Sequence, residues 1–463
     1  MSTRALFAAF SLALGSIVSL VALGAETPPA PGTPKDFKIP EKATRMLDNG
    51  VELTFIQFGE LPKVTVSALT RAGNLNEGAQ TWLADITAEM MKEGAAGMTS
   101  AQMAERAAGM GGNVAVAVGP DETSVSMDVL TEHGPDAVAL VADLLRRPTL
   151  PESEFDRIRR NFERNLALAK TRPGTLASER FLAAIYPDHP YGRVLPTVEQ
   201  LRSYTIADVR RFHAGNFGAA RTRIYVAGRF DRAAMEDALV EAFGDWARGP
   251  DPLVAPAKAN AQAKILLVNR PDAPQSTLII GLPTIDPSNP DYMGLSLTNT
   301  LLGGSFTSRI TSNIRESKGY AYSPGSSVSA RYRATYWAEN ADVTTDATVP
   351  AIKEILGEIE RLRKEAPTAA ELRGFQNYRA GVFVIQNSTR SALISQLAFI
   401  DLHGLPDEYL TRFVERVYAF TPEQISAAAR NHIDPARITI VVVGDLKKVQ
   451  PQIEKDPALK KLL

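Results

Sequence analysis

Short stretches in the first half of the chain alternate between apolar and polar residues. Residues 51–57 (VELTFIQ) and 63–69 (KVTVSAL) are rich in β-branched side chains, which favour strands. Residues 124–129 alternate strictly, the period of a half-buried strand, and they follow NVAVAV across the turn-forming residues 119–121 (GPD). Hairpins rather than repeated strand–helix–strand units indicate an α+β fold with largely antiparallel sheets flanked by helices.

A helical period dominates residues 81–95 (TWLADITAEMMKEGA). Trp82, Ile86 and Met90 recur at four-residue spacing, which places them on one face of a helix. The predicted helix runs into Gly94, and its apolar face is expected to pack against the core.

Asp85 and Glu89 lie on another face of this helix, with Ala88 between them. Two carboxylates one turn apart can contact a hard cation. A solvated acidic edge is the commoner role for such a pair, and the sequence offers no third ligand nearby. The residues themselves therefore leave both interpretations open.

The chain contains an internal repeat. The segment from Tyr204 aligns without gaps on the segment from Phe420, an offset of 216 residues, and each copy predicts a helix, a loop and a β-branched strand that ends at a glycine. Pro151 and Pro367 obey the same offset, and each introduces a charged helix. The predicted organisation is two homologous halves that enclose a central cavity: 41–246 and 263–463, with 247–262 as a Pro- and Ala-rich linker.

The N-terminus predicts a secretory signal. Arg4 precedes an apolar stretch at 5–25 that ends in small residues, so we expect a signal peptide at 1–25, followed by a Pro-rich segment at 26–40. An uncleaved anchor is the alternative, because about 20 apolar residues can span a bilayer. No later stretch is long and apolar enough to do so.

The composition excludes several classes of ligand and of catalytic site. The formal net charge is -1, from 51 basic and 52 acidic side chains, so the overall field favours neither nucleic acid nor an anionic membrane. The absence of cysteine excludes disulfides, thiolate zinc sites and a cysteine nucleophile. The five histidines never occur at the spacing that puts two imidazoles on one helix face, and His189 in a Pro-rich turn suits a structural hydrogen bond. No glycine-flanked serine elbow is present either.

The segment SNIRESKGYAYS, residues 312–323, is more unusual. Arg315 and Tyr322 flank a Lys-Gly turn, so a helix end and the following strand can direct a guanidinium and a phenol to one point. Such a pair suits gripping a peptide carbonyl and stabilising oxyanion charge. A surface arginine beside a half-buried tyrosine is the ordinary alternative, and GGSFTSR just upstream predicts a helix-to-helix turn.

Several segments together resemble the M16 family of zinc peptidases, which includes pitrilysin and the mitochondrial processing peptidase. The resemblance rests on LDNGVELTF, TRAGNLNEG, WLADITAEMMKEGA, YPDHPYGR, VAGRFD and LLGGSFTSRITSNIRESKGYAYS, which in this order cover nearly all of residues 41–446. Catalytic members carry an inverted His-x-x-Glu-His motif on the helix predicted at 81–95. Its histidines bind zinc, and its glutamate is the general base.

The chain departs from that motif. Anchored on the glycine that follows, the motif falls on residues 85–89, where Asp85 and Glu89 replace both histidines and Ala88 replaces the base. The family's third ligand, a glutamate, should fall within RNLALAK, which offers no carboxylate; Glu163 lies one turn early. The resemblance therefore implies the remains of a zinc site and no metal or other cofactor bound by this chain.

The second half keeps the family's pattern. Arg315 and Tyr322 match the arginine and tyrosine that the C-terminal half of the family presents to substrate. In two-chain members, a non-catalytic subunit donates this pair to the site of a zinc-bearing partner. The resemblance thus implies a heterodimer with a chain that carries His-x-x-Glu-His and zinc, a peptide substrate and, given the N-terminus, a periplasmic location.

Two other functions remain open. The chain can be a peptide-binding or scaffold protein of the same fold with no hydrolytic role. It can also be an enzyme that uses Asp85 and Glu89 on a different metal, although Ala88 leaves that helix without a base.

Overall fold

The computed structural model describes residues 40–463. The predicted signal peptide at 1–25 lies outside the described residues, as does all but the last residue of the Pro-rich segment at 26–40. Across residues 40–463, no helix has the length and apolar character needed to cross a bilayer.

A six-stranded sheet forms the centre of the first half, and its strands lie in the order β1-β2-β8-β3-β7-β6. Only β2 and β8 run parallel; the other neighbouring pairs are antiparallel. The strands predicted at 51–57 and 63–69 are β2 and β3, and the predicted hairpin joins β6 to β7. The bounds are β1 Lys42–Met46, β2 Glu52–Gln57, β3 Lys63–Thr70, β6 Val114–Val118, β7 Thr123–Leu130 and β8 Thr222–Gly228; β4 Gly94–Ala95 and β5 Met98–Thr99 form a separate small hairpin.

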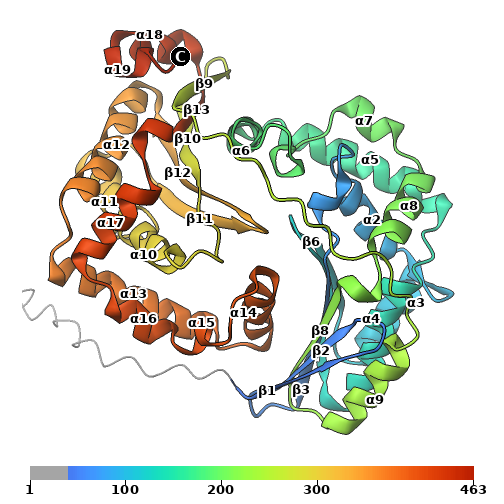
Figure 1. The fold of residues 1–463 in the computed structure, drawn as a ribbon. Helices are drawn as coiled ribbons and strands as arrows, with labels where there is room; N and C mark the ends of the chain where they lie inside the picture. The colour runs from blue at the N-terminus through green and yellow to red at the C-terminus, as the bar shows by residue number, and fades with distance from the viewer. Residues whose placement is uncertain (1–39) are drawn as a thin grey trace, which may run out of the picture. The chain divides into compact units, whose positions relative to one another are not determined.

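The second half repeats this topology. Its sheet has the order β11-β12-β10-β13-β9, which matches β6-β7-β3-β8-β2, and again only the last pair is parallel. The α+β prediction of two related, largely antiparallel sheets flanked by helices is confirmed (Figure 1). The bounds are β9 Lys264–Asn269, β10 Gln275–Thr284, β11 Gly325–Arg331, β12 Ala334–Thr344 and β13 Thr439–Gly444.

Helices surround both sheets. Those of the first half are α2 Leu83–Met91, α3 Ser100–Gly109, α4 Gly134–Arg146, α5 Glu152–Ala169, α6 Pro173–Ile185, α7 Val198–Ser203, α8 Ile206–Asn216 and α9 Arg232–Phe243. Those of the second half are α10 Tyr292–Leu302, α11 Arg309–Thr311, α12 Thr348–Lys364, α13 Ala369–Gln386, α14 Arg390–His403, α15 Glu408–Thr411, α16 Phe413–Ala419, α17 Pro422–His432, α18 Leu446–Lys455 and α19 Pro457–Lys460. Residues 247–262, the predicted linker, contain neither helix nor strand.

The internal repeat corresponds to equivalent local structure. Thr205 and Thr421, paired by the offset of 216, both begin helices with a capping box, in which the threonine side chain and the third helical residue satisfy each other's backbone N–H groups. The helices α8 and α17 that follow are equivalent, and they lead into the equivalent strands β8 and β13. The repeat therefore encodes the same helix, cap and strand twice.

Each half contributes a helix to the sheet of the other half. Helix α6 belongs to the first half but packs on β13 and β10, and α14 belongs to the second half but packs on β8 and β3 (Figure 1). Side chains alternate between the two faces of β3, so this strand contacts both halves. Val64 and Val66 lie in the hydrophobic core of the first half together with residues of α4. Thr65 and Ser67 point to the other face, where they line a cavity with residues of α14. This exchange joins the described residues into one unit.

Polar contacts support the exchange. The Arg390 guanidinium at the start of α14 donates to Asp128 Oδ1 on β7, with Nη2 at 2.8 Å. On the same sheet, the Tyr225 hydroxyl on β8 donates to Asp401 Oδ2 at 2.6 Å. Small cavities of about 160 and 190 Å³ remain between the halves, one lined in part by Asp401 and the other by Ser391.

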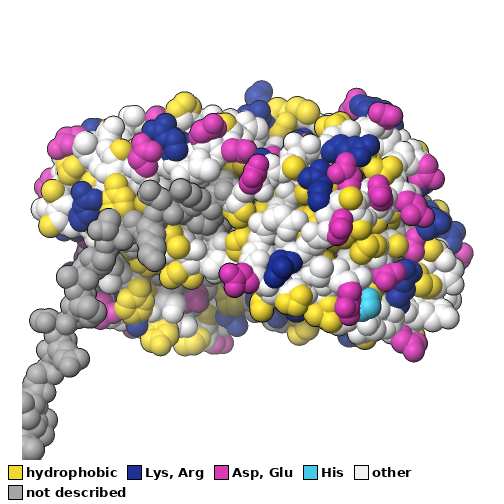
Figure 2. Space-filling model, turned by 90° about the horizontal axis from the view of Figure 1, so that it is seen from below, with side chains coloured by type: hydrophobic (Ala, Val, Ile, Leu, Met, Phe, Trp, Pro, Cys, Tyr) yellow, Lys and Arg dark blue, Asp and Glu magenta, His cyan; other side chains and the backbone are white. Residues whose placement is uncertain are grey.

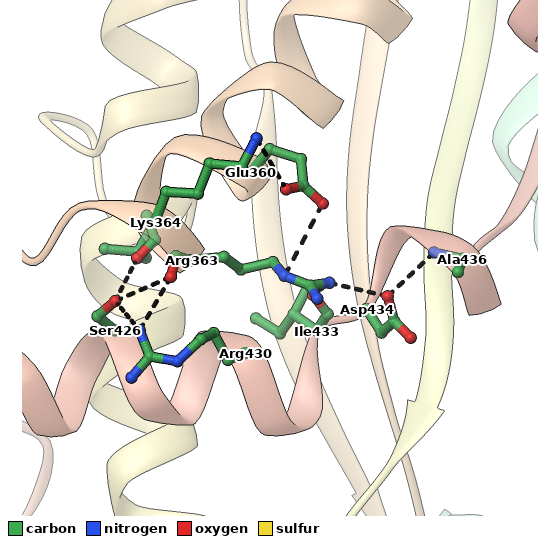
Figure 3. Close-up of polar contacts among 9 residues, drawn as sticks. Glu360, Arg363, Lys364, Ser426, Arg430, Ile433, Asp434 and Ala436 are labelled. Atoms are coloured by element: carbon green, nitrogen blue, oxygen red, sulfur yellow. Dashed lines mark hydrogen bonds and ion pairs between the residues drawn. The ribbon is translucent and has the colours of Figure 1, made fainter.

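The C-terminal end of α12 is held by α17 and the loop that follows it (Figure 3). The Arg363 guanidinium lies 2.8 Å from Asp434 Oδ1, and the Ser426 hydroxyl donates to the Leu362 carbonyl at 2.8 Å. Arg430 Nη1 donates to the Arg363 carbonyl at 2.9 Å. Because the last carbonyls of a helix have no partner within it, these side chains satisfy them and terminate α12.

Candidate functional site

Helix α2 carries the positions of the degenerate zinc motif. It begins at Leu83 and ends at Met91, so it is shorter at both ends than the helix predicted at 81–95. Trp82 precedes it in a left-handed conformation with φ 70°, and Gly94 already belongs to β4. Ile86 and Met90 are fully buried, as their spacing predicts.

Asp85 is held in a partly buried polar cluster with the short helix η1 (Asn74–Glu77). Asn74 Nδ2 donates to Asp85 Oδ2 at 2.8 Å and to Glu77 Oε1 at 3.0 Å. Burial raises the pKa of Asp85, and the hydrogen bond from Asn74 opposes that rise. The carboxylate is therefore committed to its neighbours rather than directed at an open cation site.

Glu77 is a structural residue that sequence reasoning did not identify. Its Oε1 accepts the backbone N–H of Ala84 at 2.8 Å and its Oε2 accepts that of Trp82 at 3.1 Å, so it satisfies the free N–H groups at the start of α2. Burial raises the pKa of Glu77 to about 8 in spite of these donors. An acidic residue shortly before a predicted helix is the signal that points to this role.

Ala88 and Glu89 complete the motif positions. Ala88 is buried and brings no functional group, and the partly exposed Glu89 carboxylate lies 2.6 Å from Lys92 Nζ. The stretch 164–170 on α5 supplies no carboxylate, and Glu163 is paired with Arg202 at 3.2 Å. In the part of the chain that the structure describes, no three His, Cys, Asp or Glu side chains gather closely enough to hold a metal ion. These residues do not fit the zinc site that the family motif would build.

Arg315 and Tyr322 are brought together. Arg315 lies on the π-helix η5 (Ser312–Ser317), and Gly319, with φ +66°, reverses the chain by donating its N–H to the Arg315 carbonyl. A bridge between Ala321 and Val343 then fixes the segment that carries Tyr322. As a result, the Arg315 guanidinium carbon lies 5.2 Å from the centre of the Tyr322 ring.

Phe306 completes this cluster, although its role was not predicted. It stands in the turn between α10 and α11, where the sequence predicts a helix-to-helix turn, and its ring centre lies 4.2 Å from the Arg315 guanidinium carbon. Tyr322 is 80% exposed and Phe306 is 65% exposed, so both rings face solvent around a guanidinium. Arg315 Nε also lies 3.3 Å from Glu316 Oε1. We call Phe306, Arg315 and Tyr322 the aromatic–arginine cluster.

His189, expected to have a structural role, and His213 both have structural contacts. His189 Nε2 lies 2.9 Å from the Ala255 carbonyl, and its Nδ1 accepts the N–H of Tyr191 at 3.2 Å. His213 Nε2 lies 2.9 Å from the Leu145 carbonyl, and burial lowers the pKa of this imidazole. The structural role expected for His189 is confirmed by these bonds.

Two family models match the chain: the insulinase model of peptidase family M16 over residues 61–197, and the peptidase M16 inactive domain over residues 203–378. The chain belongs to the M16 peptidase family. It is of the non-catalytic type, with Asp85, Ala88 and Glu89 at the positions of the catalytic motif. This confirms the resemblance seen in the sequence.

Similar proteins from bacteria match most of the chain. An uncharacterized zinc protease of Mycobacterium bovis is 24% identical over 422 residues, which cover 90% of this chain and 95% of that protein. An uncharacterized zinc protease of Bacillus subtilis is 21% identical, covering 82% and 93%.

Solved structures share the fold. The peptidase M16 inactive domain from Pseudomonas fluorescens matches with a TM-score of 0.81 at 25% identity, covering 87% of this chain and 98% of that one. A protease from Helicobacter pylori matches with a TM-score of 0.81 at 17% identity, covering 88% and 100%.

Replacing Glu77 with alanine is expected to destabilise the protein by about 2 kcal/mol at pH 5, because two N–H groups at the start of α2, one of them buried, lose their acceptor. The folded-state pKa of about 8 lies above the ordinary value of 4.5, so the stability that Glu77 contributes is complete below pH 4.5 and falls as the pH rises through 8. The loss should therefore be smaller at pH 9 than at pH 5. Urea denaturation followed by circular dichroism at both pH values measures it.

Glu89→Ala is the matched control, because Glu89 lies on the same helix, is partly exposed and makes a single ion pair with Lys92. It should cost no more than about 1 kcal/mol. If the two variants cost the same at pH 5, Glu77 does not cap α2.

Proposed function

We propose that this chain is the non-catalytic subunit of a heterodimeric M16 zinc peptidase, and that it donates Arg315 and Tyr322 to the substrate site of a zinc-bearing partner. The observation that carries the proposal is the exposed aromatic–arginine cluster in a chain whose motif helix has no zinc ligands and no base. Zinc and the general base are assigned to a partner chain with the His-x-x-Glu-His motif. The substrate is a peptide.

The cluster has the chemistry to bind a peptide carbonyl. A guanidinium donates hydrogen bonds in a planar fork, and a phenol O–H donates one more, so both can stabilise negative charge that develops on a carbonyl oxygen. The rings of Phe306 and Tyr322 hold the Arg315 guanidinium by cation–π contacts, which are worth about 0.5–1 kcal/mol at exposed sites. The arginine is thereby held in position before the substrate arrives.

The surface is consistent with a protein or peptide ligand rather than a polyanion. On the face seen in Figure 2, basic and acidic side chains are intermixed, and no broad region of one sign is visible. This agrees with a formal net charge of -1. A single exposed guanidinium therefore acts locally and not through a strong overall field.

The mass of the native complex, captured from the source cell with a tagged copy of this chain, tests the assembly. A 1:1 pair with a chain of similar size that carries His-x-x-Glu-His supports the proposal. A monomer or homodimer contradicts it and favours the alternative, a peptide-binding or scaffold protein without a hydrolytic role.

Replacing Tyr322 with phenylalanine should lower the turnover of the complex by on the order of 100-fold. The substitution removes one hydroxyl and keeps the ring, so the contact with the Arg315 guanidinium and the assembly of the two chains should be preserved. Steady-state cleavage of a fluorogenic peptide by the purified complex gives kcat, and size-exclusion chromatography checks assembly.

Tyr320→Phe is the matched control. Tyr320 lies two residues away, and its ring packs against the core of the second half. Its replacement should leave kcat within about twofold of wild type. Unchanged kcat in Tyr322→Phe would remove the proposed role of this phenol.

We also propose a periplasmic location, because the N-terminal pattern of a signal peptide at 1–25 is the supporting feature. Mass spectrometry of the protein from the periplasmic fraction should show a mature N-terminus near residue 26. A chain that stays with the membrane and begins at Met1 would instead be anchored.

A further inference from the structure

A cavity lies in the second half, away from the motif helix. It has a volume of about 510 Å³ and is lined mainly by residues of α10, α13, α14, α15, α16 and β11. Ligand pockets in proteins commonly measure about 300–1,000 Å³, so the space suits a small molecule or the end of a peptide.

Arg379 on α13 is the one charged side chain among the residues that line this cavity. Its Nη2 donates to the Ser296 hydroxyl of α10 at 3.3 Å, and its guanidinium carbon lies 5.3 Å from the centre of the Phe413 ring. Within residues 40–463, no carboxylate lies within ion-pair distance of Arg379. The contrast is with Arg309, which forms two 2.7 Å bonds to Glu371.

An unpaired guanidinium in a partly buried pocket favours an anionic ligand. Burial lowers the pKa of Arg379, and only the nearby tyrosines oppose this. No aspartate or glutamate is among the residues that line the cavity. An incoming anion would supply the missing counter-charge, and it would meet no acidic group on the wall.

The other residues that line the cavity indicate which kind of anion fits. Side chains with amides and hydroxyls line the same cavity as Arg379, among them Asn299, Gln386 and Ser395. The Asn299 amide is oriented by two donors to its Oδ1, the Ser326 hydroxyl at 2.7 Å and Trp337 Nε1 at 2.8 Å. A planar guanidinium can donate two parallel hydrogen bonds to one carboxylate. The neutral amides and hydroxyls can form hydrogen bonds with peptide groups next to that carboxylate.

We propose that this cavity is a binding site for a carboxylate flanked by amide groups, with Arg379 as the residue that binds the carboxylate. The C-terminal end of a short peptide has this chemistry, and so does a free N-acylated amino acid. The site does not include Phe306, Arg315 or Tyr322. This proposal is therefore tested independently of the role proposed for the aromatic–arginine cluster.

Isothermal titration calorimetry of the purified full-length chain tests the site with a tripeptide that ends in phenylalanine. Three probes are compared: the tripeptide with a free carboxylate, the same tripeptide as its C-terminal amide, and N-acetylphenylalanine. We expect the free carboxylate to bind at least tenfold more tightly than the amide. If N-acetylphenylalanine equals the tripeptide, the ligand is a free acid; if it is weaker, the ligand is a peptide end.

Arg379→Gln should weaken binding of the tripeptide at least tenfold, and Arg379→Lys should weaken it less, because it keeps the charge and loses the planar fork. Arg373→Gln, an exposed arginine on the same helix outside the cavity, is the matched control and should bind as wild type does. Thermal melts establish that each variant is folded. Absence of binding by wild type, equal binding of the amide, or full binding by both Arg379 variants would each overturn the proposal.

Discussion

Replacing Phe181 with alanine should lower the free energy of unfolding by about 3–5 kcal/mol. Phe181 lies on α6 of the first half, is fully buried, and packs edge-on against Tyr336 of the second half with ring centres 5.5 Å apart. It also lies so close to Gly281 of β10 that a Cβ at that position would come within 2.8 Å of the ring. Its loss would leave a cavity where one half covers the sheet of the other.

The measurement combines urea denaturation with limited proteolysis. Because α6 helps to join the halves, the linker at 247–262 should be cut faster in Phe181→Ala than in wild type. Leu168→Ala on the neighbouring helix α5 is the control, since Leu168 is 57% exposed and should change stability by no more than about 0.5 kcal/mol. A loss below 1 kcal/mol in Phe181→Ala would show that α6 does not secure the second sheet.

Replacing Glu339 with glutamine should reduce the loss of stability that the wild-type protein shows as the pH rises. Glu339 on β12 is fully buried, and burial raises its pKa well above the usual range, with only the backbone of Gly325 favouring the charged form. Neither carboxyl oxygen has a well-aligned hydrogen-bond donor among the described residues. The protonated form is therefore the one that the folded state accommodates.

The direction of this effect follows from proton binding. A carboxyl that binds its proton more tightly when folded contributes its full stability below the ordinary pKa of 4.5, and that contribution is lost as the pH rises toward the folded-state pKa. The loss is at most about 1.4 kcal/mol per pH unit. Between pH 5 and pH 8, the unfolding free energy of Glu339→Gln should thus fall less steeply than that of wild type by up to this amount per unit.

Urea denaturation at pH 5, 6, 7 and 8 gives both slopes. Glu354→Gln is the control: hydrogen bonds from Asn313 and Lys318 lower the pKa of Glu354, so it titrates below this range and its removal should leave the slope unchanged. Equal slopes for wild type and Glu339→Gln would show that Glu339 is charged in the folded protein at pH 8.

Local sequence patterns predicted local structure well where neighbouring residues decide it. The β-branched stretches became β2 and β3, the GPD turn closed the β6–β7 hairpin, and the repeat produced two equivalent caps at Thr205 and Thr421. The helix predicted at 81–95 was too long. Its apolar period continues to Trp82, but that residue takes a left-handed conformation before the helix begins, and its indole N–H bonds to the Val194 carbonyl.

Some features of the candidate site were likewise predictable from the sequence, and others were not. The replacement of the zinc motif at Asp85, Ala88 and Glu89 is a matter of residue identity, so it was visible in the sequence. The meeting of Arg315 with Tyr322 followed from a short turn between them. Phe306 joins them from a separate turn, and nothing in the local pattern around it predicts that contact.

The sequence by itself determined the family, the two related halves and the loss of the zinc ligands, because these depend on residue identity and on short-range periodicity. The tertiary structure alone decided that α6 and α14 cross between the halves, that Glu339 is sealed from water, and that Arg379 faces a cavity without a carboxylate. Each of these depends on which segments, distant along the chain, pack together. Burial and charge pairing are properties of that packing, and a local pattern does not contain them.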